Sequence, residues 1–173
     1  MAISVDGIKE LRQLTSCSVF DCKKALEEAK GDLEKAKKIL QKKGLEIAQK
    51  KSDRKANQGR IEAYVHLGDK LGVLLEVNCE SDFVAKNEDF KRFTRDVAMQ
   101  IAAANPKYLS KDDVPQEAAE KAADKDLFFK ASCLMEQAFI KDPNITIRDY
   151  LNSIIAKIGE NIIIRRFTRY QAG

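Results

Sequence analysis

The first fifty residues carry apolar side chains at helical spacing among many charges. A capping box at Ser18 and Asp21 predicts the start of the second of three helices. Gly31 is predicted to stop that helix, Asp32 to cap the third, and Gly44 to end the third. The three apolar stripes are Ile8, Leu11 and Leu14, then Ala25, Leu26 and Ala29, then Leu33, Ala36, Ile39 and Leu40. Helices this short cannot bury their stripes separately, so we expect a compact three-helix bundle.

The apolar period changes from helical to alternating at residue 61. Gly68 to Gly72 contains a turn, and Gly72 to Cys79 forms a returning strand, so the segment predicts a β-hairpin. The first strand is predicted to be half buried, with its apolar side inward and His66 on the polar side. In that strand Ile61, Ala63, Val65 and Leu67 alternate with Glu62, Tyr64 and His66.

Helices and one more strand are predicted after the hairpin. Asn87 can cap a helix that ends before Pro106, and a helical tract begins at Pro115. A Thr146–Asp149 capping box starts a further helix, which Gly159 stops. The buried faces expected for these helices are Phe90, Phe93, Val97 and Ile101, then Leu127, Ala131, Leu134 and Ala138, then Leu151, Ile154, Ile155 and Ile158. The β-branched run from Ile162 to Ile164 reads as a buried strand.

These elements predict the α+β class, with a three-stranded antiparallel sheet flanked by helices. We expect a helical domain at residues 1–51 and an α+β core at residues 60–173. The polar residues 52–59 suit a linker, although they could equally prolong the preceding helix as far as Asn57.

Composition is that of a soluble globular protein, with 44% hydrophobic and 34% charged residues among 173. No apolar run approaches the roughly 20 residues of a membrane-spanning helix, and the start MAISVDGIKELR lacks a secretory layout, so we expect a cytoplasmic protein that does not bind membranes. Four cysteines without CxxC spacing are expected to be reduced thiols, with Cys79 and Cys133 buried. With one histidine, we expect no metal site and no cofactor.

Charge raises the alternative of a nucleic-acid-binding protein. Residues 1–59 hold 14 Lys/Arg against 9 Asp/Glu, a net charge of +5, and a basic module could serve a ribosome-associated RNA-binding protein. However, its lysines alternate with glutamates at helical spacing, which is typical of a solvated helix face, so we expect no specific nucleic-acid partner.

In the last strand Arg165, Arg166 and Arg169 are expected to pair with Glu62, Glu76 or Glu160. A thiol enzyme using Cys22 and His66 is a third reading, and it would require a depressed thiol pKa.

The run Val77 to Asn87, VNCESDFVAKN, places an apolar ring at a change of element. Phe83 lies beside the Asp82 carboxylate between the predicted strand and helix. An outward aromatic in such a turn can act as a wedge or binding anchor. The alternative is that Phe83 and Val84 staple the helix to the sheet.

This run resembles the signature of the elongation factor Ts family, with Ser81 where members carry Thr. Two further stretches are similar to the family: KELRQLTSCSVFDCKKALEEAKGDLEKA, Lys9 to Ala36, and KIGENIIIRRF, Lys157 to Phe167. The resemblance implies a guanine nucleotide exchange factor, and not an enzyme, that binds elongation factor Tu in its GDP-bound and nucleotide-free forms during translation elongation. It further implies that the helical domain is ubiquitin-associated-like (UBA-like).

The resemblance also assigns roles to residues. Phe83 is implied to insert between helices of the nucleotide domain of elongation factor Tu and to disturb its magnesium and phosphate site. The flanking contact residues implied are Ser81, Asp82 and Val84, and those implied in the amino-terminal module are Arg12, Val19 and Phe20.

Three departures from the family pattern stand out. Members usually read TGAGMMDCK where this chain reads TSCSVFDCK, Thr15 to Lys23, so glycines are lost while apolar bulk is kept. Members generally run longer between Ala118 and Lys130. Some resemble a duplication of the core, whereas this chain has one copy, so we expect a homodimer.

Overall fold

The computed structural model describes residues 4–15 and 17–173, so residues 1–3 and Ser16 of the Thr15–Lys23 turn lie outside the described residues. The chain divides into two compact units, residues 1–54 with 152–161 and residues 55–151 with 162–173. Within the described part, no helix has the length and apolar character needed to cross a membrane.

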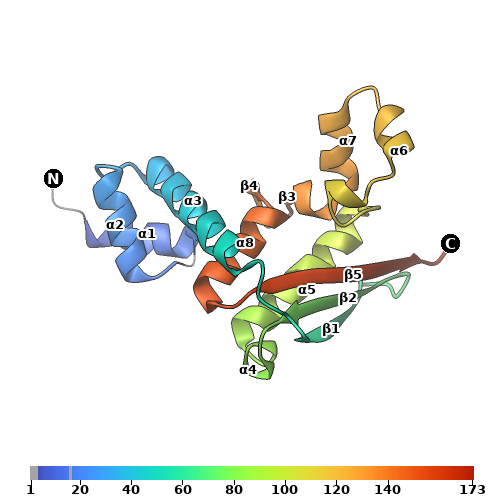
Figure 1. Cartoon of the computed structure of the whole chain (residues 1–173), viewed down its shortest axis with the longest axis horizontal. Coiled ribbons are helices and arrows are strands. Elements are labelled where there is room, and N and C mark those ends of the chain that lie inside the picture. The colour runs from blue at the N-terminus through green and yellow to red at the C-terminus, as the bar shows by residue number, and fades with distance from the viewer. Residues whose placement is uncertain (1–3, 16) are drawn as a thin grey trace. The chain divides into compact units, whose positions relative to one another are not determined.

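The first unit contains three successive helices, as predicted: α1 (Val5–Thr15), α2 (Val19–Glu28) and α3 (Leu33–Lys51) (Figure 1). Both predicted caps are present, because the Ser18 side chain accepts from the Asp21 amide and the Asp32 side chain accepts from the Lys35 amide. The buried cluster at its centre consists of Leu11, Cys22, Ala25, Leu26, Ala29, Ala36 and Leu40. The three apolar stripes therefore meet in one core, except that Leu14 of the first stripe is 52% exposed.

The predicted end of the third helix at Gly44 is wrong, because α3 continues to Lys51. Gly44 is buried in the helix, and a Cβ there would lie 3.7 Å from the Asn152 carbonyl oxygen. A glycine ends a helix by adopting a left-handed conformation, and nothing in the lysine- and leucine-rich residues around Gly44 requires one. The alternative in which the helix reaches Asn57 is also not realised.

Gly44→Ala is expected to stabilise the protein by about 0.5–1 kcal/mol, since alanine costs less backbone entropy in a helix and its Cβ makes only ordinary contacts here. Thermal or urea unfolding measures the change. Gly59→Ala is the contrasting control, because its Cβ would lie 2.3 Å from the Val77 carbonyl oxygen and should destabilise by about 1–3 kcal/mol. A lower melting temperature for Gly44→Ala would contradict the expectation.

The second unit is built on the predicted three-stranded antiparallel sheet. Its strands, in the spatial order β1–β2–β5, are β1 (Gln58–Val65), β2 (Leu71–Cys79) and β5 (Ile162–Gln171). Helix α5 (Glu88–Ala104), capped by Asn87 as predicted, packs against β1 and β2 on one face (Figure 1). The predicted stripe of α5 is fully buried and comprises Phe90, Phe93, Val97 and Ile101. This α+β unit confirms the predicted fold class.

The predicted inward face of β1 is wrong. In the central strand β2 the buried residues are Val73, Leu75, Val77 and Cys79. Residues paired in register share a face, so the β1 residues on the core side are their partners Tyr64, Glu62, Arg60 and Gln58. Consequently Ile61 and Val65 point away from α5 and are 66% and 62% exposed.

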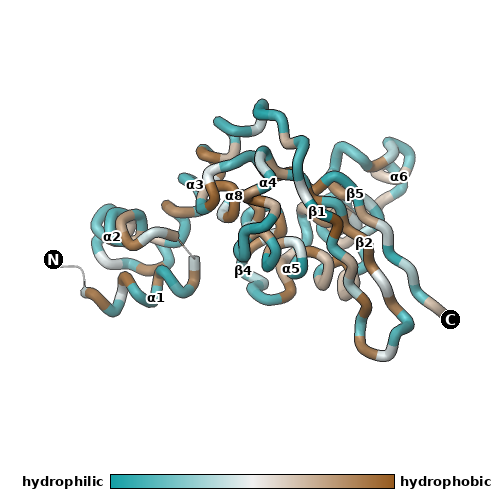
Figure 2. Tube along the Cα trace, turned by 90° about the horizontal axis from the view of Figure 1, so that it is seen from below, coloured by the Kyte–Doolittle hydropathy of each residue, from teal (hydrophilic) through white to brown (hydrophobic). Residues whose placement is uncertain are grey.

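The opposite side of the sheet therefore carries apolar residues in the open. We call Ile61, Val65, Leu74 and Tyr170 the outer sheet face; each is at least 50% exposed. Their strands are in register, with Ala63 opposite Leu74 and Gly72 opposite both Val65 and Tyr170. Figure 2 shows apolar stretches in brown along β1 and β2.

The segment from Pro115 to Ala138 is not the single helical tract predicted. It contains α6 (Gln116–Glu120), α7 (Lys125–Ser132), the 3-10 helix η2 (Leu134–Glu136) and strand β3 (Ala138–Phe139). Asp124 caps a new helix at α7, and Cys133 has extended backbone angles that end it. Leu127 is consequently exposed, whereas Leu134 is buried.

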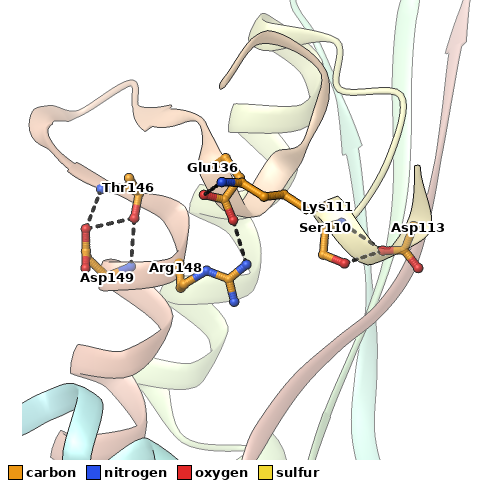
Figure 3. A network of polar contacts seen from close by, with 7 residues as sticks. All are labelled: Ser110, Lys111, Asp113, Glu136, Thr146, Arg148 and Asp149. Carbon is orange, nitrogen blue, oxygen red and sulfur yellow. Dashed lines mark hydrogen bonds and ion pairs between the residues drawn. The ribbon is translucent and has the colours of Figure 1, made fainter. Parts of the chain in front are cut away.

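Two further short elements of this unit are the 3-10 helix η1 (Lys111–Asp113) and strand β4 (Asp142–Thr146). Strand β4 pairs with β3 in a small sheet that the sequence did not suggest. Helix α8 (Ile147–Ile158) starts at the predicted capping box, where Thr146 and Asp149 exchange hydrogen bonds (Figure 3). Gly159, with φ of 86°, follows the helix as predicted.

Polar contacts join these segments of the second unit. Glu136 pairs with Arg148 at 2.7 Å and with Lys111 at 3.7 Å (Figure 3). In the interior, the buried carboxylate of Asp96 accepts from Lys141 at 2.7 Å and from the Tyr150 hydroxyl at 3.0 Å. These contacts tie α5 to the β3–β4 turn and to the start of α8.

Candidate functional site

The predicted wedge lies on α4 (Asp82–Ala85), a single helical turn between β2 and α5. Its Phe83 ring is 82% exposed, so Phe83 does not staple the helix to the sheet. The neighbouring Val84 is partly buried. The turn lies between the central strand β2, which ends at Cys79, and helix α5, which begins at Glu88 and has a buried face. Both of its ends are therefore fixed.

Hydrogen bonds around Ser81 hold the start of α4. The Ser81 hydroxyl oxygen caps the turn by accepting from the Val84 amide at 3.4 Å. The Ser81 carbonyl oxygen accepts from the Ala85 amide at 3.3 Å and from the Cys79 thiol at 3.1 Å. None of the four residues of α4 is fully buried, so these bonds add to the partial burial of Val84 and Ala85 in attaching it.

Charge flanks the exposed ring. The Asp82 carboxylate accepts from the Lys86 ammonium at 2.9 Å, and this bond lowers the pKa of Asp82 from its usual value. Asp82 therefore stays ionised at neutral pH. The exposed surface around Phe83 thus combines an aromatic ring with a carboxylate and an ammonium group.

A partly buried ion pair lies on the core side of β1 and was missed by sequence reasoning. Arg60 donates to the Glu62 carboxylate at 2.8 Å, and the Thr94 hydroxyl donates to the same oxygen at 3.3 Å. Only the register with β2 reveals this, because alternation places Glu62 on the polar side of β1, where a last-strand arginine is its expected partner. The cluster joins β1 to α5.

The amino-terminal candidates lie in the first unit. Val19 and Phe20 open α2 immediately after the Ser18 cap and are 53% and 72% exposed. Arg12 is exposed near the end of α1 and lies close enough to Cys22 to act on its thiol, although burial dominates and raises the pKa of Cys22. The structure therefore presents an apolar pair at the start of α2 and a cation on the neighbouring α1.

The alternative chemistries gain no support from these contacts. A thiol nucleophile needs a lowered pKa, and the pKa of Cys22 is raised. In the last strand, Arg166 pairs with Glu76 at 2.7 Å, as predicted. Arg169 instead donates to the Ala102 carbonyl oxygen, and Glu62 pairs with Arg60, because β1 is not a neighbour of β5. Cys79 and Cys133 are fully buried, also as predicted.

Alignments with known proteins cover nearly the whole chain. The sequence model of the family described as Elongation factor TS matches residues 9–125. A protein of Caldanaerobacter subterraneus named Elongation factor Ts is 50% identical over 194 aligned residues, which cover 99% of this chain and 97% of the relative. The chain belongs to the elongation factor Ts family. Relatives with the same name from Carboxydothermus hydrogenoformans and Thermotoga neapolitana are 51% and 45% identical, covering 99% and 100% of this chain and 89% and 98% of their own lengths.

The alignments also bear on chain length. An alignment of 194 residues exceeds the 173 of this chain, so this elongation factor Ts family member lacks residues that its relatives carry. The family match ends at residue 125, inside the segment between Ala118 and Lys130 that was predicted to be short. The position of the missing residues stays a prediction.

Proposed function

We propose that this chain binds elongation factor Tu with GDP and promotes GDP release by inserting Phe83 between helices of the nucleotide domain. As a member of the elongation factor Ts family it is a nucleotide exchange factor of translation elongation. The observation that carries the wedge assignment is the 82% exposed Phe83 ring on a turn held at both ends. A displaced helix would disturb the magnesium and phosphate site beneath it.

Exchange of this kind is a coupling between two binding sites. Binding of this chain and binding of GDP oppose one another, so each must lower the affinity of the other by the same factor. An aromatic anchor can contribute about 2 kcal/mol, which corresponds to roughly 30-fold in an equilibrium constant. The nucleotide-free form of elongation factor Tu should accordingly bind this chain more tightly than the GDP form.

The residues beside the ring complete the proposed contact. Ser81 caps the turn, Asp82 and Lys86 offer charge to the partner, and the partly buried Val84 would add an apolar contact. Exchange in this scheme forms no covalent bond, so the chain acts as a binding protein and not as an enzyme. It needs no cofactor, no membrane and no specific nucleic acid, and it acts in the cytoplasm.

The amino-terminal module supplies affinity in this proposal. Val19 and Phe20 would contact the nucleotide domain of elongation factor Tu, with Arg12 beside them. Their support is the exposed apolar pair at the start of α2. We assign residues 1–51 to a UBA-like domain, residues 52–59 to a linker and residues 60–173 to the core. The first domain alone would bind weakly without accelerating release.

Stopped-flow release of labelled GDP from elongation factor Tu, with and without this chain, tests the proposed function. Acceleration that saturates with chain concentration is expected. A chain that leaves the rate unchanged while binding RNA with a steep salt dependence would instead be the basic ribosome-associated protein.

We further propose that the chain is a homodimer through the outer sheet face. Its four large side chains, Ile61, Val65, Leu74 and Tyr170, lie on one side of three neighbouring strands and are at least half exposed. Contiguous apolar surface of this kind tends to be buried between subunits. A second copy offers the same surface, and a two-fold axis would let each face cover the other.

Leu74→Asp is expected to give monomers, because a charge on the central strand would be buried without a partner in the dimer. Light scattering at micromolar concentration under reducing conditions should give about twice the 19.5 kDa chain mass for the native protein. Leu127→Asp, at an exposed apolar position on α7, is the control and should stay dimeric. A native mass near 19.5 kDa would rule out the dimer and leave the exchange function standing.

A further inference from the structure

We infer that Cys79 is a positioning residue for exchange: its thiol fixes the direction of α4 and thereby the direction of the Phe83 ring. The inference rests on the proposed wedge function. Its starting point is the 3.1 Å contact in which the Cys79 thiol donates to the Ser81 carbonyl oxygen.

Cys79 is held on both sides by neighbouring strands. It is the last residue of β2, the central strand, and it pairs with Gln58 of β1 on one side and with Ile162 of β5 on the other. Its side chain is fully buried. The Cys79 thiol therefore has little freedom to move, and the Ser81 carbonyl group to which it donates is held in turn.

The Ser81 carbonyl group links Cys79 to α4. The same oxygen accepts from the Ala85 amide, which is the backbone hydrogen bond that closes the α4 turn. Rotation of this peptide would tilt the turn as a body. Val84 and Ala85 of α4 are only partly buried, so their packing leaves this hydrogen bond a share in resisting such a tilt.

The consequence for exchange is a separation of rate from affinity. A tilted α4 still presents Phe83 to the partner, so binding through the remaining surface persists. The ring would then reach its seat less often, and the maximal rate of GDP release would fall. A thiol is a weak donor, so the expected loss is modest, about two- to fivefold.

Cys79→Ala and Cys79→Ser form a matched pair that tests this, because both lose the sulfur and differ only in the hydroxyl donor. We expect Cys79→Ala to lower the maximal release rate about two- to fivefold per folded molecule with KM almost unchanged, and Cys79→Ser to recover most of that loss. Thermal unfolding measured in parallel supplies the folded fraction. Cys79→Val, which lacks the donor and fills more space, serves as a second donor-free variant if the alanine protein is unstable.

The outcomes separate the inference from the proposed function. Equal maximal rates for the alanine and serine variants would overturn the positioning role, since a purely structural cysteine would affect both through stability alone. Phe83→Ala is measured in the same series. If it releases GDP as fast as the native chain, the wedge itself fails. If it is slow while Cys79→Ala is normal, only the role of Cys79 is wrong.

Discussion

Phe83→Ala is expected to fold like the native chain and to lose most of its exchange activity. The ring is 82% exposed, so its removal should change the free energy of unfolding by less than about 0.5 kcal/mol. In the complex the same ring is proposed to be a buried anchor, and truncation of such an anchor costs about 2 kcal/mol or more. The expected result is a fall in kcat/KM of about 30-fold, mostly in the maximal rate of release.

Stopped-flow release of labelled GDP and thermal unfolding, measured on the same preparations, check this result. Leu127→Ala is the matched control, because Leu127 is also a large exposed apolar residue of the second unit, 66% exposed on α7. It should leave both measurements unchanged. A large drop in melting temperature for Phe83→Ala, with normal exchange per folded molecule, would show that Phe83 stabilises the fold and is no wedge.

The sequence predicted the location of the wedge better than it predicted what surrounds it. The run from Val77 to Asn87 carries its own start and stop signals, because Ser81 and Asn87 both cap helical turns through their side chains. Local hydrogen bonds of this kind are readable from residue order. The thiol contact of Cys79 is not, since it depends on how the strand directs a side chain toward a carbonyl two residues away.

The orientation of β1 could not be read from its own residues. Ile61, Ala63 and Val65 alternate with polar side chains and suggest a core face, yet β2 turns that face outward. The register with a strand whose buried residues include Val73 and Leu75 decides the matter, because a shift of one residue exchanges the two faces of a strand. The alternation within one strand therefore does not decide which of its faces is buried.

The ends of helices could also be predicted only in part from residue type. Gly31 and Gly159 follow α2 and α8 with positive φ, whereas Gly44 lies inside α3 against a backbone carbonyl. Residue type is the same in the three cases, but the backbone conformation and the surroundings differ. Conversely, the stretch from Pro115 to Ala138 looks continuous in apolar spacing but is divided by the Asp124 cap and the extended Cys133.

Replacement of both Val19 and Phe20 by Ser is expected to weaken binding to elongation factor Tu without slowing release from the complex. The pair is exposed at the start of α2, so its loss should leave the bundle core of the first unit intact. Two apolar side chains buried on binding contribute about 1.5 kcal/mol or more each, so KM should rise at least tenfold. The maximal rate should stay within about twofold, because the wedge that drives release is unchanged.

The concentration dependence of GDP release separates KM from the maximal rate in this double variant. Leu45→Ser, at a partly exposed apolar position on α3 of the same unit, is the control and should keep the native KM. The contrast with Phe83→Ala is the informative comparison, since one change is expected in KM and the other in the maximal rate. If the double variant instead lowers the maximal rate at an unchanged KM, the start of α2 takes part in release, and affinity and exchange are not divided between the two sites as proposed.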